Sequence, residues 1–310
     1  MIEIITPGLL TTVQDFGRVG VMKNGFTQNG VMDRYSMRVA NRLCGNCDSA
    51  PVLEMTVLGI TAKFTQDTVI CVSGADFDAK INDKPIRRNK AYKINNGDIL
   101  SMGAAKSGLR AYLAVAGGIV GEYVFGSAST NLKFAFGGYN GRKLQSGDVL
   151  AIGTGAFPLG DIDKWEIPES EYGNDTELRV VLGPQNDMFT GEDIKLFLSQ
   201  KYEVTAQSDR MGIRLSGEPL KSKNGMDIIS DGIVFGSIQI PRTGNPIIML
   251  ADRQTTGGYA KIATVISVDL PLLAQARPGT KVHFELIDRQ KAERLLKQEQ
   301  KEFHSYLLHY

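Results

Sequence analysis

Residues 236–270 read GSIQIPRTGNPIIMLADRQTTGGYAKIATVISVDL. Two apolar runs rich in β-branched residues, 246–251 and 260–268, have the composition of β-strands. The polar cluster 252–258 separates them and ends in paired glycines, which let a backbone take positive φ and approach a ligand closely. We therefore predict a β-rich fold with a polar loop at 252–258. This loop is either a ligand-contacting site or a polar connection between strands.

Short strand-like runs separated by glycines continue along the rest of the chain. Glycine makes up 34 of 310 residues, about 11%, where about 7% is usual. Short strands at this spacing are typical of antiparallel sheets or barrels, so we predict a mainly β fold. Three helices are expected, at 34–44 with Asp33 as N-cap, at 186–200, and from Asp288 to about His304. The expected strands are 53–58, 61–64, 69–73, 91–94, 99–102, 110–115, 149–152, 178–182, 202–205, 213–215, 237–240, 247–251, 262–268 and 281–287.

The length of the chain is sufficient for two domains. An acidic, proline-bearing stretch of poor periodicity predicts a linker at 161–176. The linker would separate a β-rich N-terminal domain, 1–160, from a second β-rich domain, 177–287. A C-terminal helix at 288–310 would follow the barrel.

Charge and hydropathy argue against several classes of partner. The formal net charge is +1, which gives no electrostatic reason to expect nucleic acid or an anionic membrane surface as a partner. No apolar run approaches the roughly 20 residues that span a bilayer, and the N-terminus lacks the basic start of a secretory signal. We expect a soluble cytoplasmic protein.

Cysteine and histidine are scarce and poorly placed for catalysis. Cys44 and Cys47 have the spacing of a redox pair, but they lie at the C-terminal end of a helix, where the dipole disfavours a thiolate. All three histidines lie at or beyond position 283. We therefore expect no histidine-based triad and no metal site. The chemistry is left to carboxylates, Arg, Lys, Tyr, hydroxyls and backbone amides.

Two further polar clusters are candidates for ligand contact. Gln14, Asp15 and Arg18 lie in a glycine-bearing stretch, where they either line a pocket or satisfy the loop backbone. Arg210 and Arg214 flank a glycine, and arginine suits planar recognition of carboxylate or phosphate. A surface ion pair is the alternative for these two arginines.

Cofactor motifs are missing from the chain. It contains no G-x-x-x-x-G-K-[ST] phosphate loop and no dinucleotide-binding G-x-G-x-x-G that leads from a strand into a helix. It also lacks an Ala-Met-Lys-Met biotin attachment sequence. If ATP or biotin takes part, we expect another subunit to present or share it.

Together these clusters resemble the allophanate hydrolase subunit 2 family, also called the KipA family or the C subunits of bacterial 5-oxoprolinase. The stretches that match the family occur in the same order along nearly the whole chain. The resemblance implies two cyclophilin-like β-barrel domains, the C-terminal one at 177–287, in agreement with two β-rich domains along the chain. The matching stretches are TTVQDFGRVG (11–20), GVMDRYSMRVANRLCGN (30–46), LEMTVLG (53–59), RAYLAVAGGI (110–119), GRKLQSGDVL (141–150), LGPQNDMF (182–189), SDRMGIRLSG (208–217) and IQIPRTGNPIIMLADRQTTGGYAKIATVISVDL (238–270).

The resemblance also implies a function. The chain would be the C subunit of an ATP-dependent 5-oxoprolinase, which opens 5-oxoproline to L-glutamate together with a KipI-like B subunit and an A subunit. ATP would be shared with the partner, and the isolated chain would be inactive. One alternative is the carboxyltransferase component of a biotin-dependent urea or amide carboxylase, the only case that involves biotin. The other is a regulatory protein that binds a KipI-like partner.

Opening a lactam requires activation, because the amide is stabilised by resonance. Phosphorylation of the lactam oxygen would make its carbon electrophilic, and positive groups must then neutralise the developing charge. We expect Asp252 to accept a proton or orient a partner and Tyr259 to donate a hydrogen bond. Arg253 and Lys261 complete the expected catalytic set. The expected substrate-binding residues are Gln14, Asp15, Arg18, Arg210, Arg214, Gln239, Arg242, Gln254, Thr255, Thr256, Gly257 and Gly258.

Overall fold

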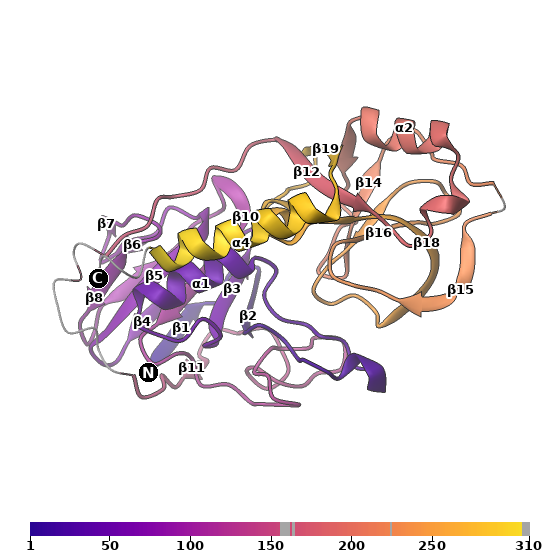
Figure 1. The fold of residues 1–310 in the computed structure, drawn as a ribbon. Helices are drawn as coiled ribbons and strands as arrows, with labels where there is room; N and C mark the ends of the chain where they lie inside the picture. The colour runs from indigo at the N-terminus through magenta and orange to yellow at the C-terminus, as the bar shows by residue number, and fades with distance from the viewer. Residues whose placement is uncertain (156–161, 163–164, 224, 306–310) are drawn as a thin grey trace. The chain divides into compact units, whose positions relative to one another are not determined.

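The computed structural model describes residues 1–155, 162, 165–223 and 225–305 (Figure 1). Strands dominate it, which confirms the prediction of a mainly β fold. Contacts group the chain into two compact units. The first comprises residues 1–19 and 29–172, and the second comprises residues 20–28 and 173–310.

The first unit contains two antiparallel sheets, ordered β11-β1-β4-β9-β6-β7 and β2-β3-β10-β5-β8. Their apolar side chains form one core, which includes Ile4, Phe64 and Leu113. Helix α1 (Arg34–Leu43) packs on β5 and β10, and the Asp33 side chain accepts a hydrogen bond from Ser36 N, as expected of the N-cap. The strands are β1 (Ile2–Thr6), β2 (Leu10–Gln14), β3 (Val52–Thr56), β4 (Thr61–Phe64), β5 (Thr68–Asp76), β6 (Lys80–Ile81), β7 (Lys84–Pro85), β8 (Ala91–Ile94), β9 (Ile99–Ser101), β10 (Ser107–Val115) and β11 (Val149–Leu150).

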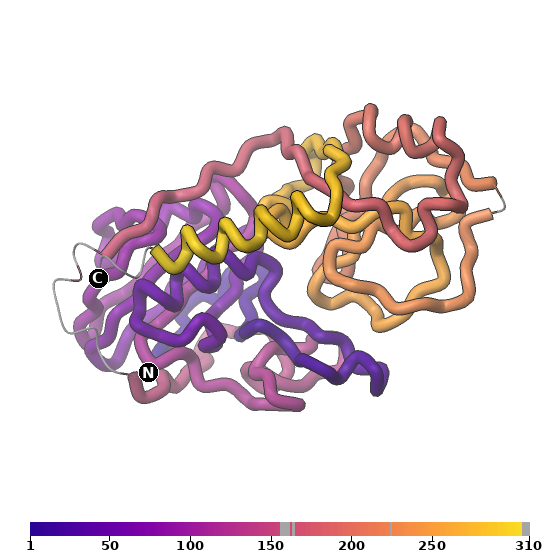
Figure 2. Tube along the Cα trace, in the orientation of Figure 1, coloured from indigo at the N-terminus to yellow at the C-terminus, as the bar shows by residue number. Residues whose placement is uncertain are grey.

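The second unit contains a closed barrel, drawn mostly in orange in Figure 1 and traced in Figure 2. Seven strands pair in the order β12-β19-β13-β14-β17-β16-β18, and β18 pairs back with β12, while β15 pairs with β18 beside the ring. Closure leaves the seven strands without a free edge, and a barrel in this half is as the resemblance implied. The strands are β12 (Asp175–Leu182), β13 (Tyr202–Val204), β14 (Gly212–Ser216), β15 (Asp227–Gly232), β16 (Ser237–Ile240), β17 (Ile247–Met249), β18 (Thr256–Val265) and β19 (Lys281–Leu286).

Several helical segments belong to the same unit as the barrel. Thr190 begins α2 (Gly191–Ser199) with a capping box to Asp193, so the residues expected to open this helix, 186–188, form a separate 3-10 turn. Phe197 of α2 stacks on Phe284 of β19 with ring centroids 4.5 Å apart. The remaining helical segments of this unit are η1 (Met22–Asn24), η4 (Ser267–Asp269), α3 (Leu270–Ala274) and α4 (Arg289–Ser305).

The expected polar loop at 252–258 is shorter than predicted. Strand β18 already begins at Thr256, so Gly257 and Gly258 are strand residues, and neither has a positive φ. Gly257 instead permits close packing, because a Cβ there would lie 2.6 Å from the Gln239 side chain.

Some expected boundaries fall outside the described residues. These are the domain boundary at 160/161, positions 163 and 164 of the expected linker, and the last five residues of the expected C-terminal helix. The division by contacts comes after Tyr172 and assigns residues 20–28 to the second unit.

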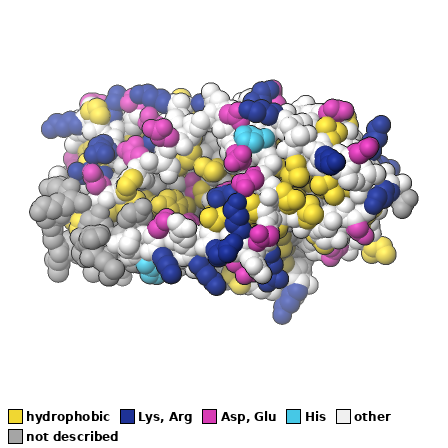
Figure 3. Space-filling view, turned by 45° about the horizontal axis from the view of Figure 1, so that its top comes forward, with side chains coloured by type: hydrophobic (Ala, Val, Ile, Leu, Met, Phe, Trp, Pro, Cys, Tyr) yellow, Lys and Arg dark blue, Asp and Glu magenta, His cyan; other side chains and the backbone are white. Residues whose placement is uncertain are grey.

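The surface shown in Figure 3 carries basic and acidic side chains interspersed with one another, in keeping with the small net charge. Within the described part of the chain, none of the helices combines the length and apolarity that crossing a membrane requires.

Candidate functional site

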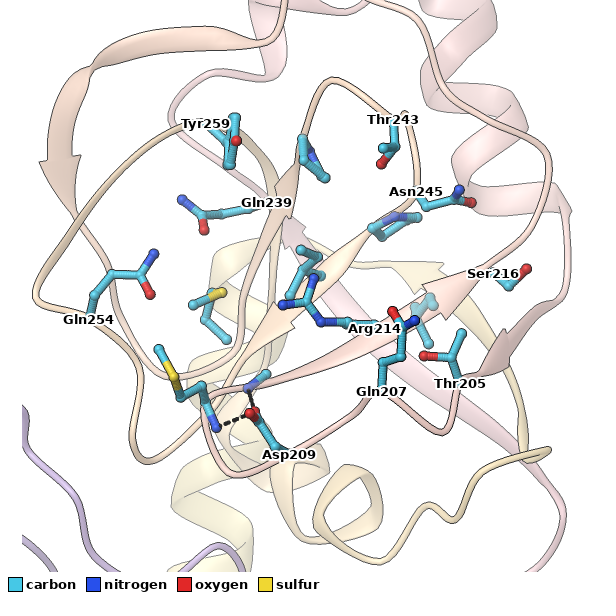
Figure 4. Close-up of a pocket in the computed structure, with 17 residues that line it drawn as sticks. Thr205, Gln207, Asp209, Arg214, Ser216, Gln239, Thr243, Asn245, Gln254 and Tyr259 are labelled. Carbon is cyan, nitrogen blue, oxygen red and sulfur yellow. Dashed lines mark hydrogen bonds between the residues drawn. The ribbon is translucent and has the colours of Figure 1, made fainter. Parts of the chain in front are cut away.

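A pocket of about 610 Å³ lies on the barrel of the second unit (Figure 4). Its volume is in the range of small-molecule sites. Met211, Pro241, Ile247 and Met249 supply apolar lining. The polar side chains that line it are Thr205, Gln207, Asp209, Arg214, Ser216, Gln239, Thr243, Asn245, Gln254 and Tyr259.

Strand register explains the floor of this pocket. Ile213, Ile248 and Ile238 form one row across β14, β17 and β16, and all three side chains are buried. The next row consists of Arg214, Ile247 and Gln239, with Ile247 paired to both neighbours. Because successive strand residues point to opposite faces, the second row faces away from the barrel interior and into the pocket.

Arg214 is the one basic residue in the lining, and Figure 4 shows its guanidinium at the centre of the pocket. The residue is exposed. Its backbone N donates to Ser208 Oγ, and its backbone O accepts a hydrogen bond from Thr205 N. No residue in the described ranges forms a hydrogen bond or ion pair with its guanidinium. A cation with no partner among the described residues is available to an anionic ligand.

Two buried polar atoms of the lining also lack partners among the described residues. Gln239 is 2% exposed, and its Nε2 has no acceptor. Thr205 Oγ1 is likewise buried without a hydrogen bond. Since buried polar groups are nearly always hydrogen-bonded, such atoms in a pocket indicate that a ligand or water completes them.

The rim of the pocket is held by an ion pair. Arg210 donates from Nε and Nη2 to the two carboxylate oxygens of Asp252, at 2.9 and 3.1 Å. Asp252 N also donates to Arg210 O at 2.9 Å. The pair joins the segment before β14 to the segment after β17, and neither side chain lines the pocket. Asp252, expected to be catalytic, is thus paired with Arg210, expected to bind substrate.

Arg253 is 4% exposed and acts as an internal tie within the second unit. It donates to Ile233 O, to Leu250 O and to Gln28 Oε1, each at 3.1 Å. These contacts attach the segment 20–28 to the barrel. Arg253 thus holds parts of the second unit together and does not line the pocket.

Lys261 and Arg242 are paired with acids on β15. The buried Lys261 amine lies 2.8 Å from Asp231 Oδ2, and this contact is the main cause that lowers the pKa of Asp231. The exposed Arg242 guanidinium lies 2.6 Å from Asp227 Oδ2, a contact that raises the pKa of Arg242.

The three N-terminal candidates lie in the first unit and are buried there. Asp15 Oδ1 accepts hydrogen bonds from Ser127 Oγ at 2.5 Å and Ser129 Oγ at 2.6 Å. Arg18 donates to Ser129 O at 2.7 Å, and Gln14 donates to Thr130 O at 3.2 Å. All three therefore brace the loop that contains residues 127–130.

The pocket brings together four of the expected site residues: Arg214, Gln239, Gln254 and Tyr259. Thr255, Thr256, Gly257 and Gly258 lie nearby in sequence but outside the lining. Sequence reasoning missed Thr205, Gln207, Asp209, Ser216, Thr243 and Asn245. The alternation of Arg214 and Ser216 with buried Ile213 and Leu215 was the signal available for part of this set.

Within the described residues, no group of three or more His, Cys, Asp or Glu side chains is placed to hold a metal ion.

A family model and two curated proteins match this chain over most of its length. Residues 24–286 match the family model of the carboxyltransferase domain, subdomains A and B. The chain is 38% identical over 305 residues to the C subunit of 5-oxoprolinase from Haemophilus influenzae, an alignment that covers 95% of this chain and 94% of that protein. It is 37% identical over 284 residues to the C subunit of 5-oxoprolinase from Escherichia coli, covering 92% and 90%.

A solved structure extends the similarity. The crystal structure of K. lactis urea amidolyase matches 98% of this chain with a TM-score of 0.90 and 33% identity. The match covers 20% of that much longer chain.

Proposed function

The chain belongs to the family of carboxyltransferase domains with subdomains A and B, and we propose that it acts as the C subunit of an ATP-dependent 5-oxoprolinase. The observation that carries the proposal is similarity over full length, since the alignments cover 94% and 90% of two proteins that are named as C subunits of 5-oxoprolinase. In this proposal a KipI-like B subunit and an A subunit complete the cytoplasmic enzyme, and the isolated chain does not turn over substrate.

The pocket suits the substrate side of this reaction. Arg214, Gln239 and Tyr259 all line the pocket, where they would offer a cation and hydrogen-bonding groups to a small lactam with a carboxylate. When the lactam is activated, these groups would oppose the negative charge that develops on its oxygen. Tyr259, which is 37% exposed, would donate a hydrogen bond there.

The same lining fits a triphosphate poorly. Phosphoryl-transfer sites surround the phosphates with several positive groups, backbone amides and Mg²⁺. The pocket lining offers one guanidinium, that of Arg214, together with the carboxylate of Asp209. We therefore place ATP in a site that a partner subunit forms or shares.

A second function is favoured by one observation. Urea amidolyase of Lachancea kluyveri is 37% identical to this chain. The alignment covers 94% of this chain and 17% of urea amidolyase. A component of a biotin-dependent carboxylase would use the same pocket for carboxybiotin beside an amide.

The test is a coupled assay with the full chain, a KipI-like B protein and an A protein, with 5-oxoproline and urea in parallel. ATP hydrolysis that depends on 5-oxoproline and requires all three proteins is expected. A matched control is Arg289→Gln, which removes an exposed arginine of α4 that lies outside the pocket. Turnover with urea and bicarbonate in the presence of a biotin carrier, but not with 5-oxoproline, would favour the second function.

A further inference from the structure

We infer that the 120–136 loop, which lies between β10 and β11 of the first unit, is a docking surface for a second protein chain. Under the proposed function that chain is the KipI-like B subunit, so the identity of the partner rests on the proposed function. The location of the surface follows from residues that the pocket does not use.

Large apolar side chains are concentrated on this loop. Isolated exposed apolar residues are normal on a protein surface, whereas a cluster of them marks a site of interaction. An aromatic side chain buries about 150–250 Å² when it is covered, so three half-exposed rings leave roughly 300 Å² of apolar surface accessible. The side chains concerned are each 40–61% exposed and lie between positions 120 and 134: Val120, Tyr123, Phe125, Leu132 and Phe134.

Two tight turns display two of the aromatic rings. Turn 124–127 closes with two backbone hydrogen bonds between its end residues and carries Phe125. Turn 131–136 closes in the same way and carries Phe134, whose N also donates to Asn131 Oδ1 at 3.0 Å. Each ring therefore belongs to a turn whose backbone is fixed by hydrogen bonds.

The first turn holds Phe125 in a strained conformation. Its φ is +52°, in the left-handed region that a bulky residue rarely adopts. Strained backbone persists only where the surrounding structure enforces it, and it is concentrated at functional sites. The strain thus favours a role for the exposed ring over a turn that only reverses the chain.

A single side chain fixes the bases of both turns. Arg18, which is 1% exposed, donates from Nε to Val124 O at 3.1 Å, and its guanidinium carbon lies 4.6 Å from the centre of the Phe136 ring. Its Nη1 donates to Asn29 Oδ1 at 3.0 Å, and the Asn131 amide donates to the same oxygen at 3.0 Å. The two turns therefore lie beside each other on one rigid support. A preformed surface of this kind loses little conformational entropy on binding.

The charges around the rings favour a protein partner. Glu122 and Lys133 are the charged residues of the 120–136 loop, and their charges cancel. An anionic membrane or a nucleic acid is bound through a cluster of basic residues, which this loop lacks. Aromatic residues with few charges are typical of the core of a protein–protein interface. A specific interface buries about 800 Å² on each partner, so the rings would form its core and neighbouring residues its rim.

The relatives of this chain occur together with further protein. The two relatives that match over nearly their full length are named as subunits, and in K. lactis urea amidolyase the match covers 20% of a much longer chain. A different protein chain is therefore the occupant assigned to the loop. Self-association of this chain is a competing outcome of the test.

The experiment measures the affinity of the full chain for the KipI-like B protein by isothermal titration calorimetry. Phe134→Ser and Tyr123→Ser should each weaken binding at least about tenfold, because aromatic residues at the centre of an interface carry most of its affinity. The matched control is Leu9→Ser. Leu9 belongs to the same unit and is as exposed as Phe134, at 55%, but lies outside the loop. This control should bind as the unmodified chain does.

Hydrogen exchange of the unmodified chain provides a measurement that needs no substitution. Peptides that cover 120–136 should gain protection when the B protein binds. The inference is overturned if the full chain does not bind the B protein, if the B protein protects other segments only, or if the loop variants bind as tightly as Leu9→Ser. It is also overturned if Phe134→Ser abolishes self-association in sedimentation, or binding to phosphatidylserine vesicles, while its affinity for the B protein stays unchanged.

These outcomes are separable from those of the coupled assay. If the three proteins together hydrolyse ATP with 5-oxoproline but the loop variants bind the B protein as the unmodified chain does, the docking surface is wrong and the proposed function stands. If the B protein binds through the loop and the three proteins show no turnover of 5-oxoproline, the proposed function fails and the docking surface stands.

Discussion

Arg210 and Asp252 form a two-contact ion pair that joins segments 42 residues apart, with nitrogen–oxygen distances of 2.9 and 3.1 Å. The side chains are 8% and 18% exposed. A pair in this position holds the loop before β14 against the loop after β17. The pair therefore fixes two segments whose neighbouring residues Asp209, Met211 and Gln254 line the pocket.

Breaking this pair should reduce stability. Arg210→Ala leaves the Asp252 carboxylate without its main partner in a largely buried position, and we expect the free energy of unfolding to fall by about 3 kcal/mol. Urea denaturation followed by circular dichroism measures the change. The matched control is Asp227→Ala, which breaks the exposed pair with Arg242 and should cost less than about 1 kcal/mol. Equal losses for the two variants would contradict the assigned role.

This pair also illustrates how far the sequence can predict the site. Composition and glycine spacing identify the polar residues at 252–258 as a group. Which of them reach a ligand depends on partners far away in sequence: Arg210 for Asp252, and Gln28, 225 residues distant, for Arg253. Short-range sequence patterns do not predict pairing between residues so far apart. The sequence therefore could not show that Asp252 and Arg253 bind other residues of the chain, whereas Gln254 and Tyr259 line the pocket.

Local features of the fold were more accessible to prediction. The N-cap of α1 at Asp33 and the β-rich character follow from interactions within a few residues. The closure of the barrel depends instead on pairing between β12 and β18, which lie more than 70 residues apart. The resemblance to a known family, rather than strand periodicity, supplied that part of the prediction.

Thiol reactivity should distinguish the three cysteines. Cys44 and Cys71 are fully buried, and burial raises the pKa of both thiols, whereas Cys47 is exposed. Because the thiolate is the reactive form, only Cys47 should react rapidly with Ellman's reagent in the folded protein. All three should react in denaturant. Rapid reaction of a Cys47→Ser variant would refute this assignment.

Removing the orphan amide of Gln239 should not destabilise the protein. A buried donor without an acceptor costs about 1–3 kcal/mol, so Gln239→Met should leave the free energy of unfolding unchanged or raise it. The same substitution at Gln200 is the control. Gln200 Nε2 donates to Tyr202 and to Glu218 O, so its loss should cost about 1 kcal/mol. Chemical denaturation of both variants provides the comparison, and a larger loss at Gln239 would show that its amide is satisfied in the protein.

The paired glycines of β18 should differ sharply in their tolerance of a methyl group. At Gly257 an added Cβ would lie 2.6 Å from both Gln239 Nε2 and Ile233 Cδ1. At Gly258 the nearest atom, Ile228 O, is 3.6 Å away, an ordinary van der Waals contact. Neither residue has a positive φ, so backbone strain contributes to neither substitution.

Gly257→Ala should therefore act through Gln239 rather than through the fold. The atoms it displaces are the ends of flexible side chains, so we expect a stability loss of at most about 1 kcal/mol. The displaced amide should weaken 5-oxoproline binding by about fivefold or more, corresponding to about 1 kcal/mol. Gly258→Ala should match the unmodified chain in both stability and affinity. Calorimetric melting and ligand titration of the two variants test this contrast. If Gly257→Ala retained full affinity, Gln239 would not contact the ligand from the position described.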